Sequence, residues 1–430
     1  MSELKRGDRG ALVEMLQLGL LRSGYLSGTA DGIFGPKTEA ALRRFQRNFG
    51  LEVTGALNAD TWETLRRFVR GYFRKKVCRG DTFWSLAAQY GCTPAEIAAA
   101  NPGVDPDRLQ IGESLTVPFG YPVIPDDVAY SSQLCAELVD GLRARYPMLE
   151  TETAGKSALG RELTVLRLGS GKKQLFAAAS FHANEWINTP VLFTFAEDCL
   201  RALVNGKKLC GTDIGALLSE VTLHLLPMVN PDGVDLVTGA LQSGAAFDAA
   251  KEIAARYPAV PFPAGWKANI RGVDLNLQFP AGWEQAKKIK YAQGYVSPAP
   301  RDYVGPAPLS APESKAVADY TCGNRFRFVL AYHTQGSVIY WTYGDDAPPQ
   351  NSEQIGRALS DASGYPLTST PPEAAYAGYK DWFIREFDRP GYTVETGSGK
   401  NPLPLSQFAS IYAANRPLLL AALKEAAVSD

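Results

Sequence analysis

Residues 174–186 read QLFAAASFHANEW, and this stretch decides the fold class of the chain. Its apolar run is short for a helix and is typical of a strand that is buried on both faces. Where the run ends, His182 and Glu185 follow at once. α/β enzymes place their sites at the carboxyl ends of such strands. The stretch therefore predicts an α/β fold with polar chemistry at one end of the sheet.

Four more stretches have the same apolar character. They are LTVLRLG (163–169), VTLHLLPMV (221–229), FVLAYH (328–333) and YTVET (392–396). Helical stretches separate them, and this alternation is typical of a sheet with helices on its faces. His224 lies between two leucines of the second stretch, and we interpret it as a core or edge histidine. No GxGxxG, GxxxxGKS or GxxxxGKT loop occurs, so nucleotide binding has no support.

A second imidazole ends another of these predicted strands. His333 follows FVLAY, so two of the three histidines in the chain lie at strand ends. With Glu185 they supply two nitrogens and one carboxylate, which is the ligand set of a catalytic zinc ion that keeps one position for water. Such an ion acidifies water and polarises a carbonyl. We therefore predict one Zn²⁺ per chain, held by His182, Glu185 and His333.

Five short motifs support this chemistry, in the order SFHANEW, PMVNPDGV, RGVDLN, AYHTQG and YTVETG. Over nearly all of residues 126–430 the chain thereby resembles the zinc carboxypeptidases of the carboxypeptidase A-like family. The resemblance implies a mixed sheet flanked by helices and zinc on the ligands named above. It also implies that Glu395 takes a proton from the zinc-bound water and returns it to the leaving amine. Asp274 would hold the distal nitrogen of His182 and fix its tautomer.

The chain departs from this family at the arginines that grip a terminal carboxylate. Asn184 and Leu277 stand in their places. Leu277 cannot bind an anion, so removal of one terminal residue loses support, although Asn276 can still donate a hydrogen bond. For the cation that stabilises the oxyanion the alternatives are Lys267, by register, and Arg271, whose guanidinium suits the role better.

The segment YAGYKDWFIREF (376–387) resembles the family segment that carries a mobile tyrosine and then the floor of the specificity pocket. Tyr376 is the first choice for this tyrosine and Tyr379 is the alternative. Lys380 would fall at the pocket floor, where a cation favours an acidic group on the residue whose amine leaves. In the other interpretation Lys380 points to solvent.

The first part of the chain, from about residue 4 to residue 68, predicts a small helical unit. Leu12, Val13, Leu16 and Leu20 recur near helical spacing, and Pro36 suits the start of a second helix. A third helical segment surrounds Trp62. Residues 24–62 closely resemble the three-helix peptidoglycan-binding domain of many wall hydrolases.

Residues 77–118 predict a strand, two helices and a closing strand. A turn and helix cap fall at residues 79–82, and Thr93 with Pro94 opens a second helix. The pattern resembles a LysM module, a βααβ unit that binds glycans containing N-acetylglucosamine. We expect Trp62 and Trp84 to be core aromatics in their modules. The glycan contacts that the resemblance implies are Gly80, Asp81, Thr82, Asn101 and Pro102.

These assignments give three domains. We expect a peptidoglycan-binding domain over 1–71, a LysM domain over 75–119 and a metallopeptidase domain over 126–430. The basic cluster at residues 74–76 is interpreted as a solvated linker, and the proline-rich residues 118–125 as a stiff connector.

This combination of features resembles that of wall endopeptidases, and the resemblance implies cleavage of the bond between the side-chain carboxyl of D-glutamate and meso-diaminopimelate in wall stem peptides. Peptidoglycan glycan strands and stem peptides are the expected partners. One alternative is a metallocarboxypeptidase that trims terminal residues from stem or ordinary peptides. A second alternative is a non-catalytic wall-binding protein.

Composition sets further bounds on the function. The formal charge of -1 gives no field that would recruit nucleic acid, and no apolar stretch predicts a membrane span. The polar amino terminus lacks the pattern of a secretory signal, so the sequence predicts a cytoplasmic protein, wall-associated in sporulating or lysing cells. Six scattered cysteines favour buried free thiols. The sequence does not decide the oligomeric state.

Overall fold

The computed structural model describes residues 3–344, 347–371 and 375–428. Contacts divide the chain into two units. The first comprises residues up to 150 together with 197–209, and the second comprises 151–196 together with the residues from 210 onward. Each unit is described by itself.

The first unit begins with the three predicted helices, α1 (Ala11–Arg22), α2 (Pro36–Asn48) and α3 (Ala59–Arg70). Pro36 occupies the start of α2, and the side chain of Asn58 caps α3 by accepting from the backbone N–H of Thr61. Apolar side chains from all three helices are buried between them. The fully buried members include Leu16, Leu42, Phe45 and Leu65.

A βααβ module follows, with β1 (Tyr72–Lys76), α4 (Phe83–Tyr90), α5 (Pro94–Ala100) and β2 (Ser114–Pro118). Thr82 and Thr93 each close a capping box at the start of a helix. The expectation that residues 74–76 form a solvated linker is wrong, because they lie in β1 and pair antiparallel with residues 114–116 of β2. Arg74 and Lys76 are exposed on alternate positions of the strand, whereas Lys75 between them pairs with Asp81 at 2.8 Å.

The proline-rich connector is packed rather than free. The backbone N–H groups of Val123 and Ile124 donate to the two oxygens of the Glu197 carboxylate, at 2.7 and 2.9 Å. Helix α6 (Ser132–Arg145) packs against α3, and Arg145 donates to the carbonyl of Tyr121. These contacts hold residues 121–124 within the first unit.

The second unit is built on an eight-stranded mixed sheet in the order β3-β4-β6-β5-β7-β10-β8-β9. The strands β6, β5, β7 and β10 are mutually parallel, whereas β4 and β8 run antiparallel to their neighbours β6 and β10. The five predicted strands are confirmed as β4, β5, β6, β7 and β10. The bounds are β3 (Glu150–Lys156), β4 (Glu162–Leu168), β5 (Lys173–Ala179), β6 (Val221–Leu226), β7 (Phe326–Thr334), β8 (Val338–Tyr340), β9 (Leu367–Thr368) and β10 (Gly391–Thr396).

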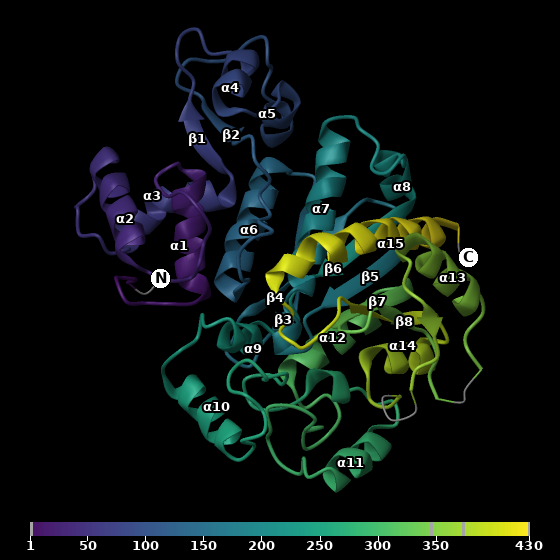
Figure 1. The fold of residues 1–430 in the computed structure, drawn as a ribbon. Helices are drawn as coiled ribbons and strands as arrows, with labels where there is room; N and C mark the ends of the chain where they lie inside the picture. The colour runs from purple at the N-terminus through teal and green to yellow at the C-terminus, as the bar shows by residue number, and fades with distance from the viewer. Residues whose placement is uncertain (1–2, 345–346, 372–374, 429–430) are drawn as a thin grey trace. The chain divides into compact units, whose positions relative to one another are not determined.

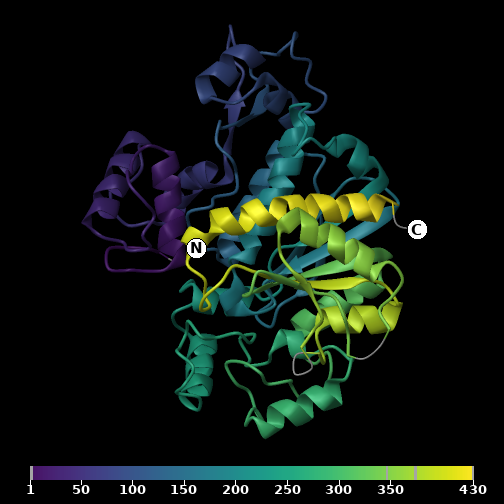
Figure 2. The same cartoon turned by 45° about the vertical axis from the view of Figure 1, so that its right-hand side comes forward.

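Helices cover both faces of this sheet, as Figures 1 and 2 show. Helices α15 and α13 pack together on one face, where α15 contacts β5 and β6. Helices α12 and α14 lie on the opposite face, where α14 contacts β7 and β10. The bounds are α7 (Asn188–Val204), α8 (Ile214–Glu220), α9 (Pro231–Val237), α10 (Ala245–Ala255), α11 (Trp283–Ala292), α12 (Pro312–Cys322), α13 (Ser352–Ser363), α14 (Tyr379–Phe387) and α15 (Phe408–Val428).

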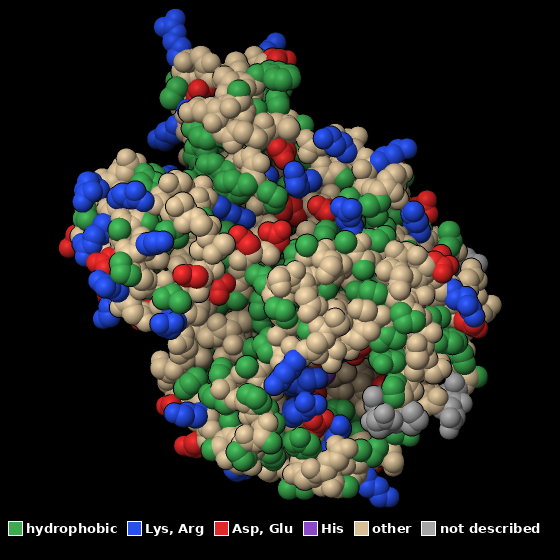
Figure 3. Space-filling view, in the orientation of Figure 1, with side chains coloured by type: hydrophobic (Ala, Val, Ile, Leu, Met, Phe, Trp, Pro, Cys, Tyr) green, Lys and Arg blue, Asp and Glu red, His purple; other side chains and the backbone are tan. Residues whose placement is uncertain are grey.

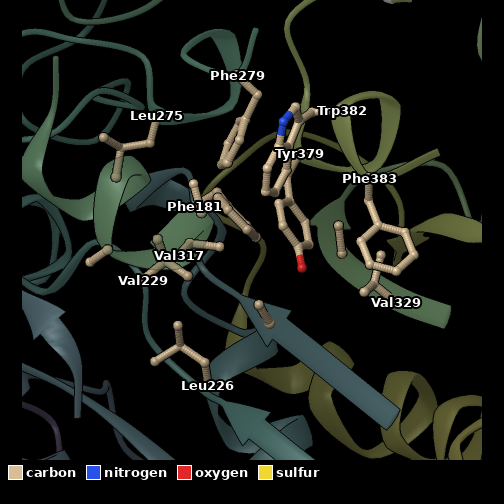
Figure 4. Close-up of a cluster of buried hydrophobic side chains, with 14 of the residues drawn as sticks. Phe181, Leu226, Val229, Leu275, Phe279, Val317, Val329, Tyr379, Trp382 and Phe383 are labelled. Carbon is tan, nitrogen blue, oxygen red and sulfur yellow. The ribbon is translucent and has the colours of Figure 1, made fainter. Parts of the chain in front are cut away.

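An aromatic cluster fills the space between the sheet and α14 (Figure 4). The rings of Phe181 and Tyr379 stack with centroids 5.6 Å apart, and those of Phe279 and Trp382 also stack at 5.6 Å. Phe181 directly precedes His182 in the chain. The cluster therefore anchors the segment that leaves β5 toward the sheet's carboxyl edge.

Strand register brings the other two strand-end residues together. His333 of β7 and Glu395 of β10 are partners in the parallel ladder, so their side chains lie on the same face of the sheet. The next residue of β10, Thr396, is fully buried and donates from Oγ1 to Oδ1 of Asn188, at 2.7 Å. This hydrogen bond ties the end of β10 to the start of α7.

None of the described helices combines the length and the apolar character that a membrane crossing requires. All six cysteines are free thiols, but only Cys199 is buried, so the expectation of buried thiols is wrong for most of them.

The Thr396–Asn188 hydrogen bond can be tested by substitution. We expect Thr396→Val to lower the free energy of unfolding by about 1–3 kcal/mol, because it leaves the Asn188 oxygen buried without its donor. Urea denaturation followed by fluorescence measures the change. Thr396→Ser keeps the hydroxyl and is the control, and equal losses in both variants would contradict the assigned role.

Candidate metal centre and active site

Three side chains converge at the carboxyl edge of the sheet. Nδ1 of His182 lies 2.9 Å from Oε1 of Glu185, and Nδ1 of His333 lies 3.0 Å from Oε2 of the same carboxylate. The two Nδ1 atoms are 3.3 Å apart. His182 and Glu185 come from the turn that follows β5, and His333 from the neighbouring strand β7. These three residues form a group that could hold a metal ion.

The spacing of these atoms fits a zinc ion. Ligands at about 2.0–2.1 Å in tetrahedral arrangement are separated by roughly 3.3 Å. Two ring nitrogens that face one carboxylate and each other cannot all be satisfied by hydrogen bonds among themselves, whereas one cation between them satisfies all three. The donor set of two imidazoles and one carboxylate is also that of catalytic zinc sites.

The other ring nitrogen of His182, Nε2, is held by a buried carboxylate. Nε2 of His182 lies 3.1 Å from Oδ1 of Asp274, which is buried. A carboxylate at this position keeps the proton on Nε2 and leaves the lone pair of Nδ1 for a metal. Burial tends to raise the pKa of Asp274, but His182 and Lys267 outweigh it and hold this pKa well below its ordinary value.

The Glu185 carboxylate is buried and is surrounded by partners. Nζ of Lys267 lies 3.0 Å from Oε1, and the backbone N–H of Thr334 donates to Oε2 at 3.1 Å. Burial would raise the pKa of Glu185, yet His182 and Lys267 keep this pKa well below its ordinary value. Burial also opposes the charge of Lys267, and Glu185 reverses that effect and raises the pKa of the lysine. The Glu185 carboxylate and the Lys267 ammonium therefore each favour the charged form of the other.

Glu395 lies beside this group without being part of it. Among the described residues its Oε2 is buried and has no hydrogen-bond partner. Burial, followed by the charge of Glu185, raises the pKa of Glu395 to about 8, while Lys267 and His182 act in the opposite direction. An unpartnered carboxylate with a pKa near neutrality suits a group that accepts and returns a proton.

A cavity of about 310 Å³ opens over these residues. Figure 3 shows Lys and Arg side chains gathered beside a hollow in the lower half of the view. A second cavity of about 550 Å³ shares Lys267, Arg301, Thr334 and Glu395 with the first. Space therefore extends to two sides of Glu395. The first cavity is lined by His182, Glu185, Lys267, Asp274, Asn276, Leu277, Lys290, Arg301, Asp302, His333, Tyr376, Lys380, Asp381 and Glu395, among others.

Comparison with known proteins agrees with this geometry. A family model described as zinc carboxypeptidase matches residues 135–417. The chain belongs to the zinc carboxypeptidase family. It is 45% identical over 295 residues to gamma-D-glutamyl-L-diamino acid endopeptidase 1 of Lysinibacillus sphaericus, covering 68% of this chain and 72% of that protein. It is 39% identical over 281 residues to an uncharacterized protein of Bacillus subtilis (strain 168), covering 65% and 73%.

A solved structure shares the fold of this chain. Thrombin activatable fibrinolysis inhibitor superposes with a TM-score of 0.57 at 19% identity, covering 71% of this chain and 76% of that chain. Further family models match the first part of the chain. A peptidoglycan binding domain matches residues 9–65, and a LysM domain matches residues 76–118.

The structure places the two candidates for the cation that stabilises the oxyanion differently. Lys267 lines both cavities. Arg271 is exposed, donates to the carbonyl of Ala158 at 3.3 Å and is not among the residues of either cavity. The structure therefore does not bring Arg271 to the site. The reason is local, because the backbone turn at residues 269–273 directs its side chain away from His182.

The structure also places the two candidate tyrosines in different surroundings. Tyr376 is half-buried and lines the first cavity. Tyr379 is fully buried in the aromatic cluster, and its hydroxyl lies 3.0 Å from Oγ1 of Thr321 (Figure 4). Tyr379 thus packs inside the protein, because it opens α14 on the face that the helix turns toward the sheet.

Lys380 lines the first cavity, but it is buried and paired rather than free. Its ammonium donates to the carbonyl of Thr342 and to Oγ1 of Thr370, and it contacts the Asp381 carboxylate. Two hydrogen bonds and one ion pair therefore engage the ammonium of Lys380. The predicted lone cation at the pocket floor is therefore a neutralised ion pair whose carboxylate also faces the cavity.

Two predicted amides occupy different cavities. Asn276 lines the first cavity, and its Oδ1 accepts from the backbone N–H of Tyr379 at 3.0 Å. This contact uses the amide oxygen of Asn276 and turns its amide nitrogen away from Tyr379. Asn184 lines the second cavity, where its buried Oδ1 has no hydrogen-bond partner among the described residues.

Sequence reasoning missed several residues of the site. Lys290, Arg301 and Asp302 line the first cavity from α11 and the loop after it. Asn401 supports the metal group from the side, because it donates to the carbonyl of Thr334 and accepts from the Thr334 hydroxyl. No motif marks these residues, since each lies in a loop or on a helix outside the predicted strands.

The LysM module has a cavity of its own, of about 670 Å³. Asp81 and Thr82 line it as predicted from the resemblance, but Gly80, Asn101 and Pro102 do not. Asn101 is buried and bonds the backbone of Ile97 and Thr116, so its role is internal. Trp84 lines the cavity with 77% of its surface exposed, so the expectation of a core aromatic is wrong there, whereas Trp62 is buried.

Proposed function

We propose that this chain is a zinc-dependent endopeptidase that hydrolyses the γ-D-glutamyl–meso-diaminopimelate bond of peptidoglycan stem peptides. The observation that carries the proposal is the 45% identity to an enzyme named for γ-D-glutamyl-L-diamino acid bonds, over 72% of that enzyme. The chain also matches the zinc carboxypeptidase family over residues 135–417. The same bond chemistry is accordingly assigned to the site at the end of β5.

The two cavities support an endopeptidase rather than an enzyme that removes only terminal residues. They meet at Lys267, Arg301, Thr334 and Glu395. Substrate residues can extend from the reacting bond to either side, one into each cavity. The leucine at position 277, where a carboxylate clamp would need an arginine, agrees with this assignment.

His182, Glu185 and His333 would hold the zinc ion through Nδ1, the carboxylate and Nδ1. When bound, zinc polarises the scissile carbonyl and makes a neighbouring water molecule more acidic. Glu395 takes the proton of the attacking water as the oxygen bonds to the carbonyl carbon. It then returns this proton to the diaminopimelate nitrogen as the carbon–nitrogen bond breaks, which leaves a carboxylic acid and an amine.

Lys267 is the residue that we assign to the developing oxyanion. Its ammonium lies 3.0 Å from Glu185 Oε1 and faces both cavities, beside the point where Glu395 acts. A fixed positive charge in a buried site stabilises charge that develops in the transition state. Arg271 is not proposed for this role, because its guanidinium is directed to Ala158.

Substrate contacts on the leaving-amine side are proposed for Asn276, Tyr376 and Lys380, and Asn184 would contact the side of the second cavity. The Lys380–Asp381 pair presents both signs of charge at the cavity wall. The end of the diaminopimelate side chain also carries both signs, as an ammonium and a carboxylate. The pair therefore suits this side chain better than a lone acidic group.

We further propose that the first two modules hold the enzyme on its substrate, in wall association in sporulating or lysing cells. The proposed domains are 1–71 for peptidoglycan binding, 75–119 for glycan binding and 126–430 for hydrolysis. In the LysM module the exposed ring of Trp84 and the polar groups of Asp81 and Thr82 line one cavity. An aromatic face beside hydrogen-bonding groups suits a sugar with apolar and hydroxyl faces.

Defined stem peptides test the bond that is cut. We expect the zinc-loaded chain to release L-Ala-D-Glu from L-Ala-γ-D-Glu-meso-diaminopimelate-D-Ala, as measured by mass spectrometry of the products. Glu395→Gln should lower the rate by about 10²- to 10⁴-fold, the range for loss of a general acid–base, while zinc content is unchanged.

The matched control is Glu386→Gln, because Glu386 is an exposed carboxylate on α14 outside both cavities. This variant should cleave at the wild-type rate. Release of free D-Ala alone would favour the carboxypeptidase alternative. Absence of any cleavage by the zinc-loaded chain would favour a wall-binding protein without activity.

Wall binding is tested by sedimentation with insoluble peptidoglycan. We expect Trp84→Ala to raise the dissociation constant by about tenfold, because burial of one aromatic face contributes on the order of 1–2 kcal/mol. Ile111→Ala is the control, since Ile111 is 71% exposed in the same module but lies outside the cavity. Equal binding by wild type and Trp84→Ala would contradict the glycan site.

A further inference from the structure

A pair of cations stands in the wall of the first cavity and has no part in the mechanism described above. Lys290 lies near the end of α11, and Arg301 lies in the loop that follows. Both contact one carboxylate: Nζ of Lys290 lies 2.6 Å from Oδ1 of Asp302, and Nε of Arg301 lies 2.5 Å from Oδ2. Two cations share one anion, so the cluster carries one surplus positive charge.

The Lys290–Arg301–Asp302 cluster is fixed relative to the metal group. The backbone N–H of Asp302 donates to Oδ2 of Asp274 at 3.1 Å. The other oxygen of Asp274 lies 3.1 Å from Nε2 of His182. One buried carboxylate thus links the loop of the cluster to a ligand of the metal centre, so the distance between cations and reacting bond is set by rigid contacts.

The cluster keeps unused donors. Among the described residues, Asp302 is the only residue whose carboxylate forms an ion pair with Lys290 or Arg301. It occupies Nε of Arg301 and one N–H of Lys290, which leaves the two terminal nitrogens of the guanidinium and two ammonium protons. The Lys290 side chain is 18% exposed and that of Arg301 is 42% exposed, so both can be reached from the cavity.

The other two lysines of this cavity, unlike Lys290, already have an assigned partner or role. Lys267 pairs with Glu185, and Lys380 has three protein partners. Because Lys267 is assigned to the oxyanion, Lys290 and Arg301 are, among the described lining residues, the cations that have spare donors and no role at the reacting bond. They share this cavity with Leu277, the position that lacks the clamping arginine.

We propose that Lys290 and Arg301 form a carboxylate-binding subsite that captures the terminal carboxylate of the substrate on the leaving-amine side. The inference rests on the proposed function. The anion-binding group missing at Leu277 is thereby supplied from α11 and the following loop. A guanidinium with two free terminal nitrogens binds a carboxylate through parallel charge-assisted hydrogen bonds.

The subsite narrows the substrate class to stem peptides whose carboxyl end is free. Two carboxylates have the required chemistry, namely the α-carboxylate of diaminopimelate in a tripeptide and that of D-Ala in a tetrapeptide. A peptide cross-linked through this end has neither. The enzyme would therefore act on uncross-linked stems and released fragments in preference to cross-linked wall.

The test compares acids with amides on the zinc-loaded full chain. The substrates are L-Ala-γ-D-Glu-meso-diaminopimelate, its D-Ala tetrapeptide, and the same two peptides with a carboxamide at the carboxyl end. For wild type we expect a KM about 10- to 100-fold lower for an acid than for its amide, because a charge-assisted bidentate contact is lost. The peptide that shows the larger ratio identifies which carboxylate is bound.

Arg301→Gln and Lys290→Gln should each raise the KM of the acid toward that of the amide, so that the ratio of the two KM values approaches one. Arg301→Lys should restore part of the ratio, since it retains the charge. Lys288→Gln is the matched control, because Lys288 is an exposed lysine of the same helix outside the cavity. It should behave as wild type.

A direct binding measurement separates this proposal from the proposed function. Calorimetry with the product meso-diaminopimelyl-D-Ala and with its amide should show tighter binding of the acid by wild type and no such difference in Arg301→Gln. Equal KM values for acid and amide in wild type would overturn the subsite while the hydrolytic assignment stands. Failure to cut the γ-D-glutamyl bond overturns the assignment, and the calorimetric difference then still decides the subsite.

Discussion

The buried carboxylate of Glu185 is the constraint on which the site depends. An unpaired charge in this position would be costly, so the surrounding structure must supply compensation from several directions. It comes from His182 in the same turn, from His333 on the neighbouring strand and from Lys267 in a distant loop. The backbone N–H of Thr334 adds a fourth contact. A zinc ion held by His182, Glu185 and His333 would be a further partner for this carboxylate.

The sheet fixes the relative positions of the residues in this group. Parallel strands β5 and β7 end side by side, and the register of β7 with β10 sets Glu395 opposite His333. The aromatic cluster below, with Phe181 at its centre, fixes the turn that carries His182. The reacting groups therefore stand on the rigid part of the fold. The residues that we propose to contact the substrate beyond the reacting bond, such as Tyr376 and Arg301, come from loops, where specificity can vary without disturbing the metal centre.

The sequence was sufficient for the strands and for the residues at their ends, because buried strands have continuous apolar runs and polar residues interrupt them visibly. It was insufficient where side-chain direction decides the outcome. Arg271 and Lys267 are four residues apart, yet only Lys267 faces the cavities. Spacing could not reveal that Asp381 neutralises Lys380. The same applies to Arg301, which no motif marks and which only the folded loop brings to the site.

The mechanism requires that a single metal ion joins the ends of β5 and β7. Anomalous diffraction at the zinc absorption edge, from crystals of the full chain grown with one equivalent of zinc, tests it most directly. We expect one strong peak within bonding distance of Nδ1 of His182, Nδ1 of His333 and the Glu185 carboxylate, absent in His333→Gln and retained in His224→Gln. A peak at another place, or none between these three side chains, would contradict it.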